Sequence, residues 1–216
     1  MVSRASTAIG YKGAQSIYYA SREVANYAGY PLNTLITINF ALTAISPLKC
    51  VEAFARLRTN HFNKWATRPG AGVGAAFDPT YFYVFENAKE NEIYLEVGEG
   101  LPHNIHTHWH AHIPASRRFD FENRVFEWLD YVAGSLSAAG AINIQDITDD
   151  NGVTPYCLKG AQKHVAKRFG AEGIYKPQGL IIGKRTGVSL NIGPKVRKEM
   201  DTENGVDRRW RLRRAA

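Results

Sequence analysis

Histidines stand at alternate positions in the segment NIHTHWHAHIP, residues 104–114. His106, His108, His110 and His112 occupy every second position and His103 lies just upstream, so this segment holds most of the chain's seven histidines. Imidazole nitrogens bind divalent transition metals. Side chains two residues apart on a β-strand share one face, about 6.7 Å apart. Neighbouring imidazoles on such a strand can therefore converge on one metal ion.

The alternation also predicts which side of the strand packs on the core. Four alternate positions span about 20 Å, so two adjacent histidines, with a third ligand from elsewhere, are expected to hold the ion. Nitrogen and carboxylate ligands suit Mn, Fe or Zn and leave positions open for a substrate oxygen. The alternative is a row of solvated histidines without a metal. The opposite face is expected to be buried and carries Ile105, Thr107, Trp109, Ala111 and Ile113.

A tyrosine and two lysines form the second pattern with chemical potential. The segment TPYCLKGAQKHVAKRFG (154–170) predicts one helix, on which Tyr156, Lys159 and Lys163 share a face. A phenol is a weak nucleophile with a pKa of about 10. A nearby cation and a metal-polarised phosphate make its attack feasible. The alternative is that Tyr156 packs in the core and the lysines are solvated.

Strand and helix patterns alternate along the rest of the chain. Strands are expected at 31–45, 80–88 and 141–148, and 91–100 is expected to be a strand or a hairpin arm. Helices are expected at 47–66 and 117–136, from apolar residues at helical spacing. Residues 1–30 have mixed periodicity. This interleaving predicts an α+β fold. The apolar side of the 117–136 helix is expected to consist of Phe121, Val125, Trp128, Leu129 and Val132.

Composition is that of a globular, basic chain. A length of 216 residues allows one large domain with a sizeable core. The net charge of +7 and the 12% aromatic content are compatible with binding to nucleic acid, and equally with a globular protein that is merely basic. Two cysteines make neither a disulfide framework nor a CxxC metal site. Without an apolar run of membrane length or a signal-peptide core, we expect a cytoplasmic protein and no membrane partner.

The two patterns together resemble the HUH endonucleases, specifically the single-tyrosine rolling-circle replication initiators (Rep proteins) of plasmids and small DNA genomes. LITINF (35–40) is similar to the family's first motif, HTHWHAHIP to its His-hydrophobe-His motif, and YCLKG to its tyrosine-x-x-lysine motif. Their order matches over about residues 33–165. The resemblance implies a central antiparallel sheet flanked by helices around an RRM-like core. The nuclease domain would span 31–194, between an N-terminal arm (1–30) and a basic tail (195–216).

The resemblance also implies a ligand set for the metal. Aligning the HIP ending with that of bacterial relatives selects His106 and His108, although a threonine then stands where the family has a hydrophobe. His108 and His110, with a tryptophan between them, are the alternative pair. The third ligand in the family is often a glutamate on a neighbouring strand. Glu86 in YVFEN is the first choice and Glu96 the second.

The activity implied by the resemblance is nicking and joining of single-stranded DNA with Mn²⁺ or Mg²⁺ as cofactor. Tyr156 would attack the phosphate and form a covalent 5′-phosphotyrosine link, while Lys159, helped by Lys163, neutralises charge or orients the phenol. The partners would be a single-stranded DNA origin, alone or as a hairpin, and a host or viral helicase in trans, since GxxxxGK[ST] is absent. The setting would be a plasmid or phage in a bacterial cytoplasm.

The basic tail allows two interpretations, and three other functions remain as alternatives to the nuclease. The tail is expected either to bind DNA phosphates and stack a base or to be a disordered charged terminus. One alternative is a metal-dependent phosphodiesterase that uses water as the nucleophile. Its activity would be retained in Tyr156→Phe, and it would form no covalent adduct with DNA. The others are a non-catalytic zinc-stabilised DNA-binding protein and a sequence-independent single-strand binder. The DNA-binding residues of the tail would be Arg208, Arg209, Trp210, Arg211 and Arg213.

Overall fold

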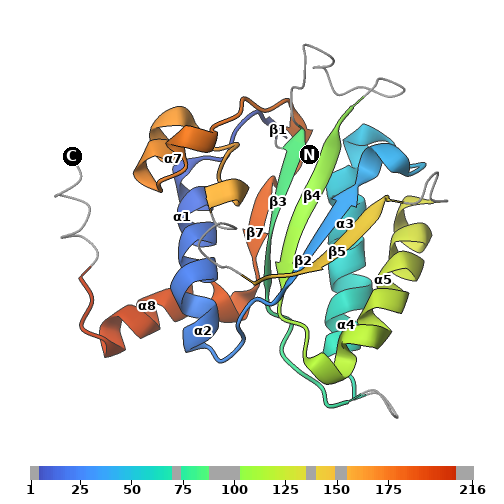
Figure 1. Ribbon diagram of the computed structural model, residues 1–216, viewed down its shortest axis with the longest axis horizontal. Helices are drawn as coiled ribbons and strands as arrows, with labels where there is room; N and C mark the ends of the chain where they lie inside the picture. Colours follow the sequence, from blue (N-terminus) through green and yellow to red (C-terminus); the bar gives the residue numbers. More distant parts are fainter. Residues whose placement is uncertain (1–4, 70–73, 88–102, 135–139, 149–154, 208–216) are drawn as a thin grey trace.

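A five-stranded antiparallel sheet forms the centre of the molecule (Figure 1). The computed structural model describes residues 5–69, 74–87, 103–134, 140–148 and 155–207. The strand order is β5-β2-β4-β3-β7, which makes the histidine strand β4 the central strand. Two short strands, β1 (Ala5–Ser6) and β6 (Ile181–Ile182), pair separately. The strands of the large sheet are β2 (Thr34–Asn39), β3 (Tyr81–Asn87), β4 (Ile105–Ala111), β5 (Ile142–Asp146) and β7 (Thr186–Val188).

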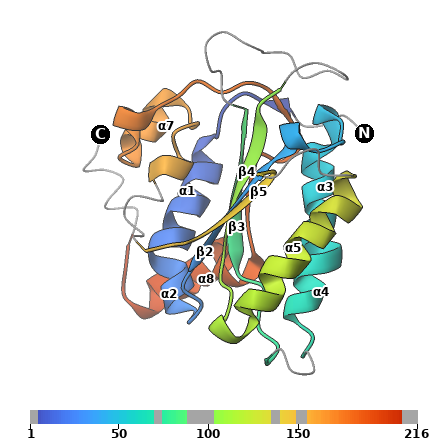
Figure 2. The same ribbon diagram turned by 45° about the vertical axis from the view of Figure 1, so that its right-hand side comes forward.

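Helices cover both faces of this sheet (Figures 1 and 2). The predicted α+β fold, with a central antiparallel sheet flanked by helices, is therefore confirmed. One face carries α3 (Cys50–Arg56), the π-helical segment Leu57–Phe62, α4 (Asn63–Ala66) and α5 (Arg118–Ala133). The other carries α1 (Tyr11–Tyr19), the π-helical segment Ala20–Val24, α2 (Ala25–Tyr27), α7 (Lys163–Arg168) and α8 (Pro194–Glu203). Single 3₁₀ turns lie at Phe40–Leu42, Pro47–Lys49, Ala115–Arg117, Glu172–Ile174 and Leu190–Ile192.

The two faces of β4 have different environments, as the alternation predicted. Trp109 is fully buried and its ring contacts Phe62 edge-on, with a centroid distance of 4.8 Å. The other residues of that face are buried in the same core, beneath α3 and α5. The apolar side predicted for the 117–136 helix is buried as well. Burial of this face fixes the direction of the histidines, because a slip of one residue would turn them into the core.

Residues 11–27 form part of the helical layer on one face of the sheet. Helix α1 packs against the sheet in a second core that includes Ile17, Phe82 and Val84. Likewise α8 takes up the first part of the segment predicted as a basic tail. The π-helical segment shifts the helical face within the continuous helix over 11–27, which disturbs the periodicity there.

The single helix predicted over 154–170 is wrong. A helical turn at 155–157 is followed by a turn at 158–160, and α7 begins only at Lys163. Ile9 causes the break, because its N–H donates to the Gly160 carbonyl at 2.9 Å and its carbonyl accepts from the Gln162 N–H at 3.1 Å. These groups would otherwise carry the helical hydrogen bonds. Lys163 is exposed and, beyond the break, does not share a helical face with Tyr156.

Candidate active site

Strand register brings three of the predicted metal ligands together. Residues paired across neighbouring strands point to the same face of a sheet. Glu86 on β3 is paired with His106 on β4, and His108 follows two positions along the same face. His108 Nε2 lies 3.3 Å from Glu86 Oε2, and His106 Nε2 lies 4.0 Å from it. One ligand atom from each residue lies within 4.8 Å of the other two, so the group can hold a metal ion.

The donor set and its unsatisfied atoms fit a divalent ion. His108 Nδ1 lies 3.2 Å from Thr37 Oγ1, and a proton on Nδ1 would leave the Nε2 lone pair facing Glu86. Glu86 Oε1 is buried and has no hydrogen-bond partner among the described residues. The side chain of His106 is 19% exposed, so the group opens toward solvent on that side. Three protein ligands leave coordination positions for a substrate oxygen.

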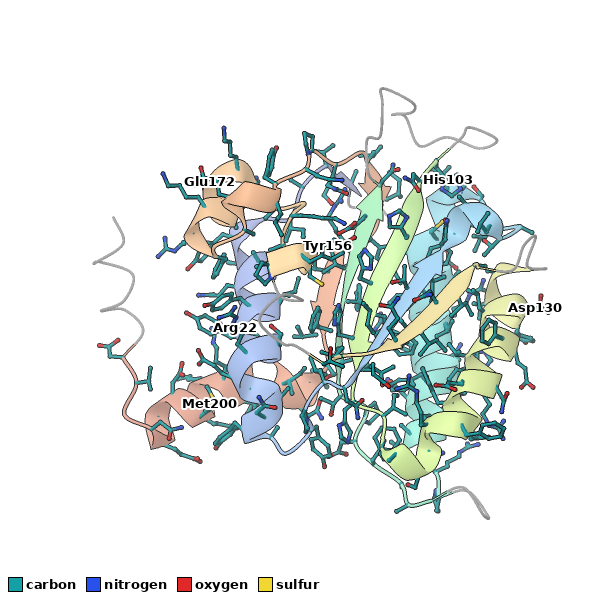
Figure 3. The ribbon with its side chains drawn as sticks, in the orientation of Figure 1. Arg22, His103, Asp130, Tyr156, Glu172 and Met200 are labelled. Carbon is teal, nitrogen blue, oxygen red and sulfur yellow. The ribbon has the colours of Figure 1, made fainter. Side chains whose placement is uncertain are left out.

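Tyr156 and Lys159 lie directly beside the three ligands. Lys159 Nζ is 2.8 Å from Glu86 Oε2 and 3.6 Å from the centroid of the Tyr156 ring. The Tyr156 ring is 5.4 Å from the His108 ring. Tyr156 is 46% exposed, whereas Glu86 is 1% exposed. Figure 3 shows Tyr156 between the helical layer and the sheet. A substrate can therefore reach the phenol, while the carboxylate stays shielded beneath it.

The charges of Glu86 and Lys159 stabilise each other. Burial of Glu86 opposes its ionisation, but the nearby His108 side chain and the Lys159 ammonium outweigh this and lower its pKa. Burial opposes the charged form of Lys159, but the Glu86 carboxylate and then Tyr156 outweigh this and raise its pKa. Lys159 therefore stays protonated at neutral pH, and it contributes positive charge rather than a base.

Replacing Lys159 tests this charge balance. We expect Lys159→Met to raise the affinity for Mn²⁺ by about tenfold or more, because the ammonium contacts the carboxylate oxygen that would bind the ion and repels a cation. Isothermal titration calorimetry measures the change. Lys167→Met, an exposed position of α7, is the matched control. An unchanged or weaker Mn²⁺ affinity in Lys159→Met would contradict competition between the Lys159 ammonium and the metal ion for the Glu86 carboxylate.

His110, the alternative ligand, lies away from this group. Its ring stacks on Phe82 with a centroid distance of 4.3 Å, and its Nε2 lies 3.1 Å from Cys157 Sγ. Burial, and then the charge of His108, lower the pKa of His110 to about 3, and burial raises the pKa of the Cys157 thiol. The neutral thiol can thus donate to a neutral imidazole. This contact anchors the 155–157 turn, and with it Tyr156, over the sheet.

The buried, neutral state of His110 makes stability depend on pH. Between about pH 6.5 and 3 the unfolded chain binds a proton at this residue and the folded chain does not, so stability falls as pH falls, by about 1.4 kcal/mol per pH unit. In His110→Phe this loss disappears, and the free energy of unfolding should depend less steeply on pH between 6 and 4.5. Urea titrations in EDTA test this, with His164→Gln on α7 as control. An unchanged slope in His110→Phe would refute it.

Several predicted residues lie elsewhere or outside the described part of the chain. Lys163 is beyond the helix break and is not placed with Tyr156 and Lys159 on one helix face. Glu96 lies within 88–102, which the structure does not describe. The DNA-binding residues proposed for the tail, Arg208, Arg209, Trp210, Arg211 and Arg213, also lie outside the described residues.

The sequence pattern missed the residues that support the ligands. Thr37 is a polar residue at a half-buried position of β2 and faces His108, a signal visible only once the register is known. Arg185 is buried, and its guanidinium donates to the Phe85 carbonyl at 3.2 Å and the Gly179 carbonyl at 2.7 Å. These hydrogen bonds fix the position of the backbone next to Glu86. No local pattern identifies such long-range contacts.

Comparisons with protein-family models, with curated proteins and with solved structures found no match. Within the described ranges, none of the helices has both the length and the apolar character needed to cross a bilayer. The resemblance to HUH endonucleases therefore stays a hypothesis based on the three motifs, and the site geometry is the independent support for a function.

Proposed function

We propose that the protein is a metal-dependent endonuclease that nicks and rejoins single-stranded DNA through a covalent link to Tyr156. One observation carries this proposal: an accessible phenol, a buried ammonium and a three-residue ligand group form one continuous cluster. Lys159 joins the parts, since it contacts both the Glu86 carboxylate and the Tyr156 ring. A water-using hydrolase would not require the tyrosine and lysine at this position.

The ligand group is proposed to hold Mn²⁺ in preference to Mg²⁺. Two imidazoles and one carboxylate favour a transition metal, because Mg²⁺ prefers oxygen ligands. A divalent ion bound by Glu86, His106 and His108 would act as a Lewis acid on a phosphate oxygen. Thr37 orients the His108 ring through Nδ1. The ligands are thus set by strand register and by a neighbouring hydroxyl rather than by a loop.

Tyr156 is proposed as the nucleophile. Its Oη forms a bond to phosphorus as the bond from phosphorus to the 3′ oxygen breaks, and the phenolic proton passes to water at this half-exposed position. The 3′ oxygen takes up a proton and leaves as a hydroxyl. The phosphotyrosine keeps the energy of the broken bond, so a later 3′ hydroxyl can attack it, restore the strand and release the phenol.

Lys159 stabilises the negative charge that develops on the phenol and the phosphate. Its ammonium stays protonated through the Glu86 contact and is already in place before substrate binds. A fixed positive charge in a partly buried site stabilises a developing anion without reorganisation. Lys159 is therefore the electrostatic partner of Tyr156, and the exposed Lys163 is not part of this step.

The biological role proposed from the motif resemblance is initiation of rolling-circle replication on a plasmid or phage. The substrate would be a single-stranded origin or a hairpin, and a helicase would act in trans.

Incubation with labelled single-stranded oligonucleotides and Mn²⁺, followed by denaturing electrophoresis, tests the proposal. Hairpin-containing and random pools are both included, and EDTA is the metal control. We expect a shorter product with a 3′ hydroxyl and a slower band in which the protein is bound to the 5′ end of the downstream fragment. Cleavage without this band would favour water as nucleophile. DNA binding without cleavage by any pool would favour the non-catalytic alternative.

A further inference from the structure

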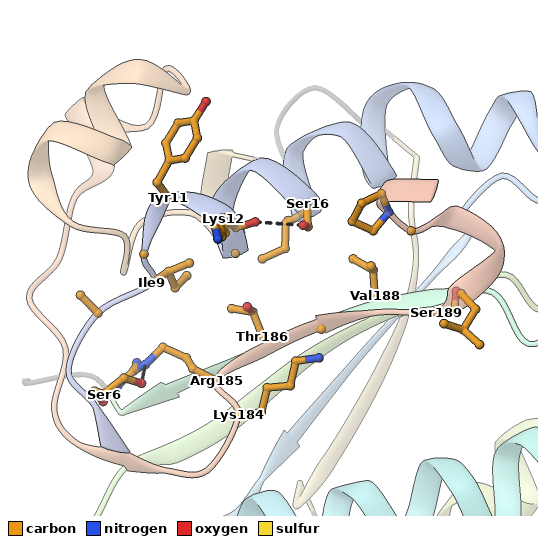
Figure 4. Close-up of a pocket in the computed structure, with 18 of the residues that line it drawn as sticks. Ser6, Ile9, Tyr11, Lys12, Ser16, Lys184, Arg185, Thr186, Val188 and Ser189 are labelled. Carbon is orange, nitrogen blue, oxygen red and sulfur yellow. Dashed lines mark hydrogen bonds between the residues drawn. The ribbon is translucent and has the colours of Figure 1, made fainter. Parts of the chain in front are cut away.

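A trough of about 790 Å³ lies between α1 and the edge strand β7 (Figure 4). Thr186 and Val188 point from β7 toward the helix. Gly13 allows this close approach, because a Cβ on it would lie 2.8 Å from Thr186 Oγ1. The volume is within the range of about 300–1,000 Å³ that is typical of ligand pockets.

The residues that line this trough give it positive charge along its length. Lys12 comes from α1, Lys184 from the segment before β7, and Lys195 from the first turn of α8. None of the described residues that line the trough is acidic. Its apolar lining is mainly aliphatic, with Tyr11 as the one aromatic side chain among the lining residues. Cations spread over three elements suit a chain of phosphates better than one small anion, and the lining offers little for base stacking.

The trough begins next to the strand that carries Glu86. Arg185 lines the trough, and its carbonyl accepts from the Phe85 N–H at 2.7 Å, one residue before Glu86. Neighbouring strands lie about 4.8 Å apart. One DNA strand could therefore contact both the metal ligands and the trough.

We infer that the trough binds the phosphate backbone of single-stranded DNA on one side of the nicking site, through Lys12, Lys184 and Lys195 and independently of base sequence. This inference rests on the proposed function, since it names the same DNA strand as ligand. It adds a second contact region that positions the strand without taking part in bond cleavage.

Salt-dependent binding of a fluorescein-labelled 15-nucleotide oligo(dT) tests the inference. Fluorescence anisotropy is measured in EDTA and in a Tyr156→Phe background, so that binding is separate from cleavage. Lys12→Ala combined with Lys184→Ala is compared with the control Lys49→Ala combined with Lys64→Ala, at exposed sites outside the trough. Each pair lowers the net charge equally, from +7 to +5 (+7 − 2 = +5). Thermal melting verifies folding.

The variant with Lys12→Ala and Lys184→Ala is expected to bind oligo(dT) more weakly than the parent protein. The magnitude of the slope of log K against log salt should fall by about 1.4, because each lost phosphate contact on a single strand removes about 0.7. The control variant should keep the slope of the parent protein. The variant with Lys12→Arg and Lys184→Arg should also keep it, because arginine retains the positive charge at both positions. Equal losses in the trough and control pairs, or a parent that does not bind oligo(dT), would overturn the inference. Binding through the trough combined with a negative nicking assay would overturn the proposed activity instead.

Discussion

Glu86→Gln is expected to weaken Mn²⁺ binding by a factor of about 100 or more, equivalent to about 2.8 kcal/mol, and to abolish metal-dependent nicking. Glu86 is the one anionic member of the ligand group and is almost fully buried. Glutamine keeps the shape but removes the charge that attracts the ion. It also leaves Lys159 without its carboxylate partner, 2.8 Å away in the native protein.

Calorimetric titration with Mn²⁺ and the nicking assay measure the two effects. Glu122→Gln is the control because Glu122 lies on α5, on the opposite face of the sheet, and its side chain is 43% exposed. Loss of a buried charge partner can also destabilise the protein, so circular dichroism confirms that the variant is folded before titration. A folded Glu86→Gln protein with unchanged Mn²⁺ affinity would exclude this carboxylate as a ligand.

Tyr156→Phe is expected to eliminate the covalent adduct and to slow nicking by on the order of 10⁴-fold or more, as loss of a nucleophile does in other covalent enzymes. The phenylalanine ring preserves the contacts with His108 and Lys159, so Mn²⁺ affinity should not change. Tyr156→Phe is therefore expected to lose nicking while it keeps its Mn²⁺ affinity, whereas Glu86→Gln is expected to lose both.

The matched control is Tyr131→Phe, at an 80% exposed position on α5. It should retain both adduct formation and nicking. Nicking by Tyr156→Phe at the parental rate would identify water, or another side chain, as the nucleophile and would exclude the covalent link to Tyr156.

Local periodicity was sufficient to predict the elements that position the ligands. The period-two pattern of β4 placed Trp109 in the core and the histidines on the opposite face, because burial of one face sets the register. The 117–136 helix followed in the same way from its apolar stripe. Neither prediction needed knowledge of distant contacts.

Contacts between distant segments account for what the sequence did not predict. The 154–170 segment has a helical pattern, but pairing with Ile9 breaks it near Gly160. His106 and His110 look equivalent along β4, yet Cys157 packs over His110 while Glu86 lies opposite His106. The alternative ligand pair could be set aside only once these pairings were known.

Mass spectrometry of the covalent product tests the role of Tyr156 as the nucleophile. Wild-type protein is reacted with oligonucleotides and Mn²⁺, the DNA is trimmed with nuclease, and the tryptic peptides are sequenced to find the residue that carries the nucleotide. We predict a 5′-phosphodiester on Tyr156. A nucleotide on any other residue, or cleaved DNA with no modified peptide, would contradict it.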